Sequence, residues 1–298
     1  IADAWRSFRH PRGSGNLGRT LETHTETRLS RHLEHAAEGS CHARRRPATA
    51  DAEPAVFQRC DRQPASEGDL TMPDFEPIVG RYFTMDVQNA SCRIYVEEAG
   101  DGIPLVCLHT AGSDARQYRH LLCDPAITDH YRVIAFDLPW HGKSLPPPGF
   151  RRYEYKLTTD LYKETVMAFC RAYDLANPVV MGCSMGGRVV LHLALEQASY
   201  FKAVIALEGS DKLEPYYDLD WLNRPDVHGG EVCAAFVSAQ VAPQSPDEYR
   251  WETLWHYMQG GPGVFKGDLY FYWHDGDFDD RSPLIDTEKC PVYLLSGE

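Results

Sequence analysis

The sequence lacks three features that would place the protein in a special class. Its nine cysteines are scattered along the chain, and none forms a C-x-x-C pair. No apolar run approaches the roughly 18 residues of a membrane span. The N-terminal residues also hold no apolar segment typical of a secretory signal. These absences disfavour a disulfide framework and a membrane-spanning segment, and scattered thiols are typical of a reducing, cytoplasmic location.

Lysine is absent from the first 71 residues, which carry 11 arginines and 10 acidic residues. The whole chain has a net charge of −13, so residues 72–298 hold a net charge of −14. A domain this acidic argues against nucleic acid and against an anionic membrane as the main partner. With 43% hydrophobic residues among 298, the chain suffices for a sizeable core in one large domain or two small ones.

Residues 1–71 also differ from the rest of the chain in their patterning. They contain no tyrosine, they include the run Arg44-Arg45-Arg46, and their apolar residues follow no sustained period of 2 or 3.6. We expect a disordered tail, or sequence upstream of a natural start at Met72. A basic arm or a targeting peptide is the alternative, although a transit peptide would show a clearer amphipathic helix.

After Tyr82 the sequence alternates between short apolar runs and helical patterns. Residues 104–109 and 131–137 are strongly apolar, as expected for strands that are buried on both faces. Helices are expected at 158–173, capped by Thr158 or Thr159, and at 185–197. Further strands are expected at 82–87, 91–98, 178–183, 201–207 and 292–296. Strands that alternate with helices predict an α/β fold with a doubly wound, mainly parallel sheet.

The segment 182–186, with the letters G-C-S-M-G, places Ser184 in a G-x-S-x-G pattern between an expected strand and an expected helix. This context gives the pattern its value, because the sharp turn exposes the serine hydroxyl and the helix N-terminus faces the reacting carbonyl group. We therefore expect Ser184 to be a nucleophile. The alternative is a glycine-rich packing turn, and Cys183 is expected to be a buried neighbour.

Three motifs at expected strand ends make the chain from about Tyr82 onward resemble the α/β-hydrolase family. They are H-T-A-G at 109–112, D-L-P-W-H-G-K-S at 137–144 and G-C-S-M-G-G at 182–187. The second is similar to the family pattern D-x-x-G-H-G-x-S, with Trp140 in place of a glycine. The S-M-G-G form is similar to that of serine esterases, cofactor-free haloperoxidases and carbon–carbon bond hydrolases of aromatic degradation. The resemblance implies the α/β-hydrolase fold, with no cofactor and no metal ion.

The resemblance also implies an oxyanion hole beside Ser184. Backbone N–H groups of Ala111 and Met185 would form it. Thr110 stands where the family has glycine, and its side chain would either narrow the acyl pocket or add a hydroxyl group. His109 and His141 are expected to be structural loop residues and not bases.

The stretch between Glu208 and Lys289 is rich in aromatic residues and too long for a simple connection. It contains helical patterns at 230–241 and 247–258, the second with a capping box formed by Ser245 and Glu248. This stretch would shape a pocket for a small apolar or aromatic acyl substrate, unless its rings only form a core of their own. We expect a hydrolase core at 72–208, a helical cap at 209–288 and a return to the core at 289–298.

Two motifs in the expected cap imitate functional sites. His228-Gly229-Gly230 is similar to an oxyanion motif, but no strand precedes it. Residues 275–286 are similar to a calcium loop, yet the sixth position is Asp280 instead of glycine and the twelfth is Asp286 instead of glutamate. We expect a solvated acidic loop there, without a metal ion.

The order of a catalytic triad in this fold is serine, acid, histidine. By the resemblance, the acid, the last strand, the histidine and a final helix would follow the strand at 292–296. We therefore expect a truncated copy whose catalytic histidine lies beyond Glu298, and a chain that is inactive alone. Glu208, after the strand at 201–207, is an alternative acid. A histidine of the cap would be an unusual base.

The leading hypothesis is a serine hydrolase that cleaves a carboxylic ester or a lactone through an acyl-enzyme on Ser184. A carbon–carbon bond hydrolase is the enzymatic alternative, and its acidic substrate would need a cationic clamp. Arg188 lies next to the turn at 182–186, which we call the elbow. It is a candidate clamp, unless it is an exposed helix residue or an ion-pair partner. A non-catalytic binding protein on the same fold is the third hypothesis, and a homodimer stays open.

Overall fold

The computed structural model describes residues 75–214, 220–223 and 229–297, all within one folded unit, Asp74–Glu298. The expected tail at 1–71, the expected start at Met72 and His228 lie outside these residues. The predictions that concern them therefore stay predictions.

Seven strands of the described residues form one sheet in the order β1-β2-β4-β3-β5-β6-β7. The first two form an antiparallel hairpin, β2 also runs antiparallel to β4, and every other neighbouring pair is parallel. A mainly parallel α/β sheet is therefore confirmed. The strands are β1 (Val79–Val87), β2 (Ala90–Ala99), β3 (Ile103–Leu108), β4 (Tyr131–Phe136), β5 (Val179–Cys183), β6 (Ala203–Leu207) and β7 (Val292–Leu295).

Side chains of the central strands alternate between two hydrophobic cores, one on each face of the sheet. In β3, Val106 and Leu108 join one core, whereas Leu105 and Cys107 join the other. Helices cover both faces, which explains why these strands are apolar throughout. The first core is covered by α5 (Thr159–Ala172) and α6 (Met185–Glu196), and the second by η1 (Ala115–Tyr118), α3 (Arg119–Leu122) and α4 (Pro125–Thr128).

Local signals set several boundaries. Of the two predicted caps, Thr158 and Thr159, it is Thr158 that caps α5, because its side chain accepts a hydrogen bond from the N–H of Leu161 at 3.2 Å. Gln88 and Asn89 form the tight turn between β1 and β2, with φ angles of 46° and 64°. β1 begins at Val79, earlier than predicted, because its pairing with β2 extends along the whole hairpin.

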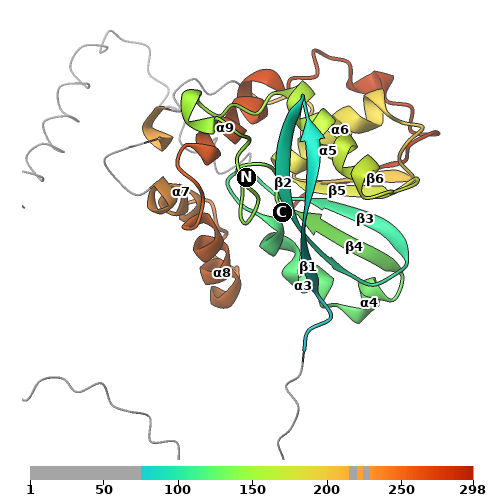
Figure 1. Cartoon of the computed structure of the whole chain (residues 1–298), viewed down its shortest axis with the longest axis horizontal. Helices are drawn as coiled ribbons and strands as arrows, with labels where there is room; N and C mark the ends of the chain where they lie inside the picture. Colours follow the sequence, from blue (N-terminus) through green and yellow to red (C-terminus); the bar gives the residue numbers. More distant parts are fainter. Residues whose placement is uncertain (1–74, 215–219, 224–228, 298) are drawn as a thin grey trace, which may run out of the picture. The chain divides into compact units, whose positions relative to one another are not determined.

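The stretch between β6 and β7 is largely helical. In Figure 1, the helices labelled α7, α8 and α9 lie to the left of the sheet. Both predicted helices are present, although α7 ends earlier than predicted. The elements are η3 (Asp220–Leu222), α7 (Gly229–Ser238), α8 (Asp247–Tyr257), α9 (Val264–Tyr270), a π-helix η4 (Phe271–Asp275) and η5 (Ser282–Leu284). We call residues 209–288 the cap.

The predicted capping box of α8 is wrong. Pro246 is the N-cap residue of this helix, and no side chain caps it. Ser245 belongs to the preceding turn, where its N–H donates to the carbonyl oxygen of Ala242 at 3.0 Å. The proline therefore starts the helix one residue too late for Ser245 to reach its first N–H groups.

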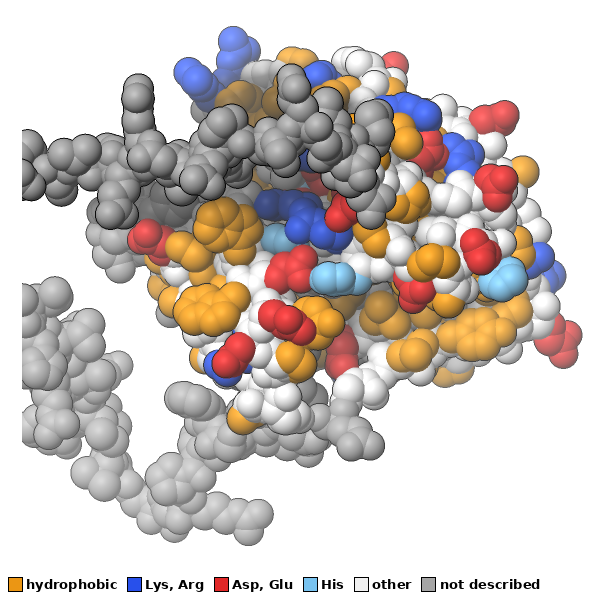
Figure 2. Space-filling view, turned by 90° about the horizontal axis from the view of Figure 1, so that it is seen from below, with side chains coloured by type: hydrophobic (Ala, Val, Ile, Leu, Met, Phe, Trp, Pro, Cys, Tyr) orange, Lys and Arg blue, Asp and Glu red, His pale blue; other side chains and the backbone are white. Residues whose placement is uncertain are grey.

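The surface mixes charge with apolar side chains. On the face shown in Figure 2, acidic, basic and apolar groups are interspersed. Two large exposed rings, Trp251 and Trp255, lie one helical turn apart on α8, with 70% and 63% of their surface exposed. Among the helices of the described residues, none has the length and apolar character that crossing a membrane requires.

Candidate active site

Ser184 occupies the turn between β5 and α6, with φ of 56° and ψ of −109°. A positive φ at a residue with a Cβ atom is sterically costly and persists only where the surroundings impose it. Two hydrogen bonds impose it here. The N–H of Ser184 donates to the carbonyl oxygen of Leu207 at 2.8 Å, and its own carbonyl accepts from the N–H of Arg188 at 2.8 Å. The strand–turn–helix context predicted for this serine is present.

Three glycines make this turn sterically feasible. A Cβ atom on Gly182 would lie 2.2 Å from the backbone of Gly186. A Cβ atom on Gly186 would lie 2.6 Å from the carbonyl oxygen of Leu108, and one on Gly187 would lie 2.6 Å from that of Leu207. The elbow therefore packs directly against the ends of β3 and β6, where side chains would not fit.

The side chain of Ser184 is half-buried and lies beside the side chain of Tyr272. Tyr272 belongs to the π-helix η4 of the cap. Burial raises the pKa of Tyr272, although the contact with Ser184 and the charge of Arg188 oppose this shift. The phenol therefore stays protonated and can donate a hydrogen bond. Sequence analysis placed Tyr272 only among the aromatic residues of the cap.

Cys183 precedes the serine and is not a second nucleophile by its environment. Burial raises the pKa of its thiol, and a hydrogen bond with Gln117 only partly opposes this. A protonated buried thiol is a weak nucleophile. By surface exposure Cys183 is half-buried, so the expectation of a buried neighbour is met only in part.

The turn at 109–113 follows β3 and lies against the elbow. The N–H of Thr110 donates to Oε1 of Gln117 at 2.8 Å, and the N–H of Gly112 donates to Oδ2 of Asp268 at 2.7 Å. Ala111 lies between these two anchored residues and is buried. Burial raises the pKa of Tyr257 and the nearby side chain of Thr110 opposes this shift, so this departure from the family glycine adds a polar contact with the cap.

His109 is fully buried and neutral. Its Nδ1 donates to the carbonyl oxygen of Thr110 at 2.9 Å, and its Nε2 accepts from the N–H of Leu138 at 3.2 Å. Burial, with a smaller contribution from the neighbouring His141, lowers the pKa of His109 to about 4. Both ring nitrogens are therefore used within the loops, which agrees with the structural role expected for this residue.

His141 is also buried, but both of its nitrogens face acceptors. Nδ1 donates to the carbonyl oxygen of Pro139 at 3.0 Å and Nε2 donates to Oδ2 of Asp268 at 2.8 Å. Burial would lower the pKa of His141, yet the charge and hydrogen bond of Asp268 more than offset it, so the pKa is raised. The pair is therefore a buried imidazolium with a carboxylate. Asp268 comes from α9 of the cap, and sequence analysis missed it.

Arg188 is neither an exposed helix residue nor part of a side-chain ion pair within the described residues. Only 1% of its surface is exposed. Its Nε donates to the carbonyl oxygen of Gly276 at 2.5 Å, and one Nη donates to that of Asp211 at 3.3 Å. The guanidinium thus joins α6 to both ends of the cap, and its other Nη meets no hydrogen-bond acceptor among the described residues.

Glu208, the alternative acid, directly follows β6 and has a φ of 51°. Its N–H donates to the carbonyl oxygen of Leu295 at 2.8 Å. Its carboxylate accepts a hydrogen bond from the N–H of Gly297 and lies close enough to Tyr272 to raise the pKa of that phenol slightly. The structure therefore places Glu208 near the elbow, on the side of β7.

The acidic loop that imitates a calcium site is used for structure. The side chain of Asp275 accepts from the N–H of Thr159 at 2.5 Å and so holds the start of α5, while Asp277 accepts from the N–H of Asp279 at 2.8 Å. In the part of the chain that the structure describes, no three histidine, cysteine or acidic side chains are grouped as a metal site would need.

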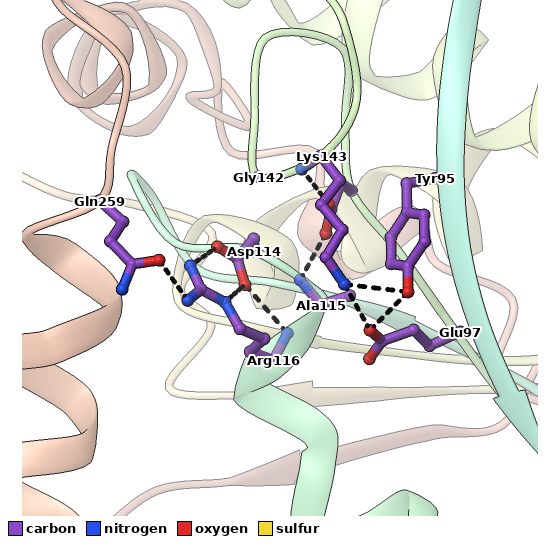
Figure 3. A pocket seen from close by; sticks show the side chains of 9 residues that line it. Tyr95, Glu97, Asp114, Ala115, Arg116, Gly142, Lys143 and Gln259 are labelled. Carbon is purple, nitrogen blue, oxygen red and sulfur yellow. Dashed lines mark hydrogen bonds and ion pairs between the residues drawn. The ribbon is translucent and has the colours of Figure 1, made fainter. Parts of the chain in front are cut away.

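A cavity of about 130 Å³ lies beside the motif at 137–144 (Figure 3). The charged groups around this cavity form ion pairs with each other: Arg116 pairs with Asp114, and Lys143 pairs with Glu97 at 3.3 Å. Asp137 lies under this cavity and accepts from two backbone N–H groups. Burial, together with the charge of Asp114, raises the pKa of Asp137 to about 6.

A second cavity, of about 300 Å³, is lined by Trp140, Tyr153 and Tyr155 among other residues. Neither this cavity nor the smaller one is lined by Ser184. They therefore flank the loops that support the elbow, and they are not the space above the serine.

Comparison with known proteins agrees with this geometry. A family model described as the alpha/beta hydrolase fold matches residues 103–260. "Uncharacterized hydrolase YugF" of Bacillus subtilis is 30% identical over 238 residues, which cover 73% of this chain and 80% of that protein. A 2-hydroxy-6-oxo-6-(2'-aminophenyl)hexa-2,4-dienoic acid hydrolase of Metapseudomonas resinovorans is 30% identical over 142 residues, 44% of this chain and 46% of that one.

A solved structure gives the same result for the fold. A thermophilic esterase from Thermogutta terrifontis superposes with a TM-score of 0.58 and 17% identity, over 73% of this chain and 80% of the esterase. The family model covers more than half of the chain, and the Bacillus relative is matched over most of its length. The chain belongs to the α/β-hydrolase family.

Proposed function

We propose that this protein is a serine hydrolase that cleaves a carboxylic ester or a lactone through an acyl-enzyme on Ser184. The observation that supports this most directly is the backbone of Ser184, held at a φ of 56° between β5 and α6. Such strain persists where the surroundings over-determine it and clusters at active sites. It lifts the hydroxyl out of the turn toward the cap, where Tyr272 meets it.

The chemistry follows from the position of the serine. Its hydroxyl oxygen attacks the ester carbonyl carbon and loses its proton to a base, and the negative charge moves to the carbonyl oxygen. The N–H groups of Met185, at the start of α6, and Ala111, in the turn after β3, are the proposed donors to that oxygen. The alcohol then leaves with a proton, and water cleaves the acyl-serine in a second, equivalent cycle.

We propose that the base lies outside the described residues. His109 and His141 use both ring nitrogens within the supporting loops. The side chain that meets Ser184 is Tyr272, whose raised pKa suits a donor better than a base. The earlier expectation, a histidine beyond Glu298, stays a proposal. Among the described residues Glu208 is the candidate acid.

The proposed substrate is a small apolar or aromatic acyl compound. The cap that faces the elbow contributes Tyr257 and Tyr272 to its surroundings, each with a hydrogen-bonding hydroxyl. Such walls favour a flat apolar group with few polar atoms. The acidic chain is a poor match for nucleic acid or an anionic membrane. The reaction as proposed uses no cofactor and no metal ion.

The second candidate is a carbon–carbon bond hydrolase. A relative from Metapseudomonas resinovorans carries such a name. Its support in this chain is Arg188, which has one Nη without an acceptor among the described residues, yet two backbone carbonyls hold the rest of the guanidinium. That engagement favours a structural role, so ester cleavage is the first proposal.

Two substrates separate the candidates. An ester hydrolase should turn over p-nitrophenyl acetate in a manner that depends on Ser184, whereas a carbon–carbon hydrolase should prefer a vinylogous diketo acid. Comparing kcat/KM for both substrates in the protein that includes the proposed histidine base, and in its Ser184→Ala variant, tests the proposal. A preference of tenfold or more for the diketo acid would overturn ester specificity, and activity on neither would favour a non-catalytic protein.

A further inference from the structure

The turn proposed to carry half of the oxyanion hole is held on both sides by the cap. On one side, the side chain of Thr110 lies beside the phenol of Tyr257 at the end of α8. On the other, the N–H of Gly112 donates to Asp268 of α9 at 2.7 Å. Ala111 lies between these two contacts. The position of its N–H therefore depends on side chains that are more than a hundred residues away in the sequence.

Asp268 is the more consequential of the two contacts. Its side chain is fully buried, and burying a carboxylate is costly unless it is paired and hydrogen-bonded. Three donors from three separate segments meet this requirement. Gly112 and His141 donate to Oδ2 at 2.7 and 2.8 Å, and the hydroxyl of Tyr155 donates to Oδ1 at 2.8 Å.

Packing around this carboxylate leaves little freedom. Gly112 has a φ of 69°, and a Cβ atom there would lie 2.8 Å from the ring of Phe265, three residues before Asp268 on α9. Gly267 is equally close to Tyr155, since a Cβ atom would lie 2.6 Å from its carbonyl oxygen. The helix α9 therefore packs its side chains against the turn and its backbone against the segment around Tyr155.

The charge on Asp268 is matched by a buried cation. His141 donates from both nitrogens and so carries a positive charge. The groups that face its ring are the carboxylates of Asp268 and Asp137, the neutral ring of His109 at 4.7 Å between centroids, and the phenol of Tyr155. The ion pair links the cap to the loop at 137–144, and the carboxylate of Asp268 also holds the turn at 109–113.

We propose that Asp268 is a positioning residue for acyl transfer: its carboxylate fixes Gly112, and thereby holds the N–H of Ala111 where the oxyanion forms. Tyr257 supports the same turn through Thr110. This inference rests on the proposed function, because an oxyanion exists only if Ser184 attacks a carbonyl. This role is more than a contribution to stability, because the turn that Asp268 holds supplies the N–H of Ala111, the proposed donor to the reacting oxygen.

The test compares Asp268→Asn with Asp220→Asn. Asp220, at the start of η3, forms an ion pair with Lys266 of α9, and the side chain of Asp220 is 93% exposed. In Asp268→Asn, the amide keeps the shape but cannot accept from all three donors. We expect kcat for p-nitrophenyl acetate to fall by about 100-fold with KM within about twofold, because small misplacement of catalytic groups costs that much. Asp220→Asn should match the parent protein.

Two further readouts do not depend on turnover. In Asp268→Asn, the amide signal of Gly112 should shift in nitrogen–hydrogen correlation spectra and exchange faster with solvent. His141 should titrate at lower pH than in the parent protein, because it loses its carboxylate partner. Should Asp268→Asn fail to fold, Tyr257→Phe removes only one hydroxyl and should still lower kcat severalfold at unchanged KM.

The outcomes are distinct. A folded Asp268→Asn protein with kcat within twofold of the parent would overturn the inference. A variant in which KM alone rises, so that kcat/KM falls while kcat is unchanged, would overturn it as well. Full turnover in Ser184→Ala would instead show that the proposed function itself is wrong. Loss of kcat in Asp268→Asn, together with the shifts at Gly112 and His141, would support the positioning role.

Discussion

The N–H of Ser184 donates to the carbonyl oxygen of Leu207 at 2.8 Å, so the tip of the elbow is tied to the end of the neighbouring strand β6. This bond is the last rung of the parallel ladder, the one that pairs Cys183 at the end of β5 with Leu207. The chain can therefore leave the sheet sharply without an unpaired N–H at the serine. The strain at Ser184 is offset by the sheet itself.

The glycines around the elbow should tolerate no side chain. We expect Gly186→Ala to lower the free energy of unfolding by about 1–3 kcal/mol, because overpacking against rigid backbone costs that much. The added methyl group would lie 2.6 Å from the carbonyl oxygen of Leu108. Urea denaturation measures the change. Gly229→Ala is the control, since among the described residues its methyl group would meet only Pro262, at 3.9 Å; equal stability of both variants would contradict the packing argument.

Sequence patterns predicted the fold well where burial decides the pattern. The apolar residues of β3 and β4 face a core on each side, so their composition alone indicated parallel strands. Thr158 was one of two predicted caps, because a hydroxyl group just before a helical pattern can accept a hydrogen bond from an N–H group of the first turn. The capping box at Ser245 failed because Pro246 shifted the start of α8, and a pattern of residue types does not fix such a shift.

The supporting side of the site was not predictable in the same way. The elbow around Ser184 is local, so G-x-S-x-G and its flanking elements predict it. Asp268 and Gly112 are 156 residues apart, and Asp268 in sequence is only one acid within a short helix. Tyr272 was one ring among many. Contacts that the tertiary fold creates between distant segments leave no periodic signal in either segment.

Two buried neutral histidines should make the protein sensitive to acid. Burial lowers the pKa of His109 and His192 to about 4 each. Between pH 6.5 and pH 4, the unfolded chain binds protons that these two folded rings do not, so stability falls as pH falls, by up to about 1.4 kcal/mol per pH unit for each ring. Asp137, with a pKa raised to about 6, opposes this below pH 6, because its folded form keeps its proton.

The acid sensitivity can be assigned to one ring. His192 stacks on Phe278 with centroids 3.9 Å apart, so His192→Phe should fit an apolar environment. We expect the Tm of this variant to fall less between pH 6.5 and pH 4.5 than the Tm of the parent protein. Differential scanning calorimetry at several pH values checks it. His130→Gln, an exposed position, is the control, and identical pH profiles for His192→Phe and the parent would refute the assignment.

The strand β7 should promote self-association. It pairs with β6 at the edge of the described sheet, and Tyr293, Leu294 and Leu295 are 57%, 66% and 53% exposed. An exposed apolar edge strand is a template for pairing with another chain. We expect Leu294→Lys to reduce concentration-dependent association of residues 1–298 in sedimentation velocity. Leu145→Lys is the control at an isolated exposed leucine, and equal effects of both would show that the edge is not responsible.

The central claim is that Ser184 forms an acyl-enzyme. The most direct measurement is mass spectrometry of the protein, in a form that includes the proposed histidine base, after rapid quenching with p-nitrophenyl acetate, with peptide mapping of the adduct and kcat for Ser184→Ala in parallel. The account predicts one acetyl group on Ser184 and a fall in kcat by several orders of magnitude in the alanine variant, because loss of a nucleophile leaves only binding and the oxyanion hole. An adduct on another residue, or unchanged turnover in Ser184→Ala, would contradict it.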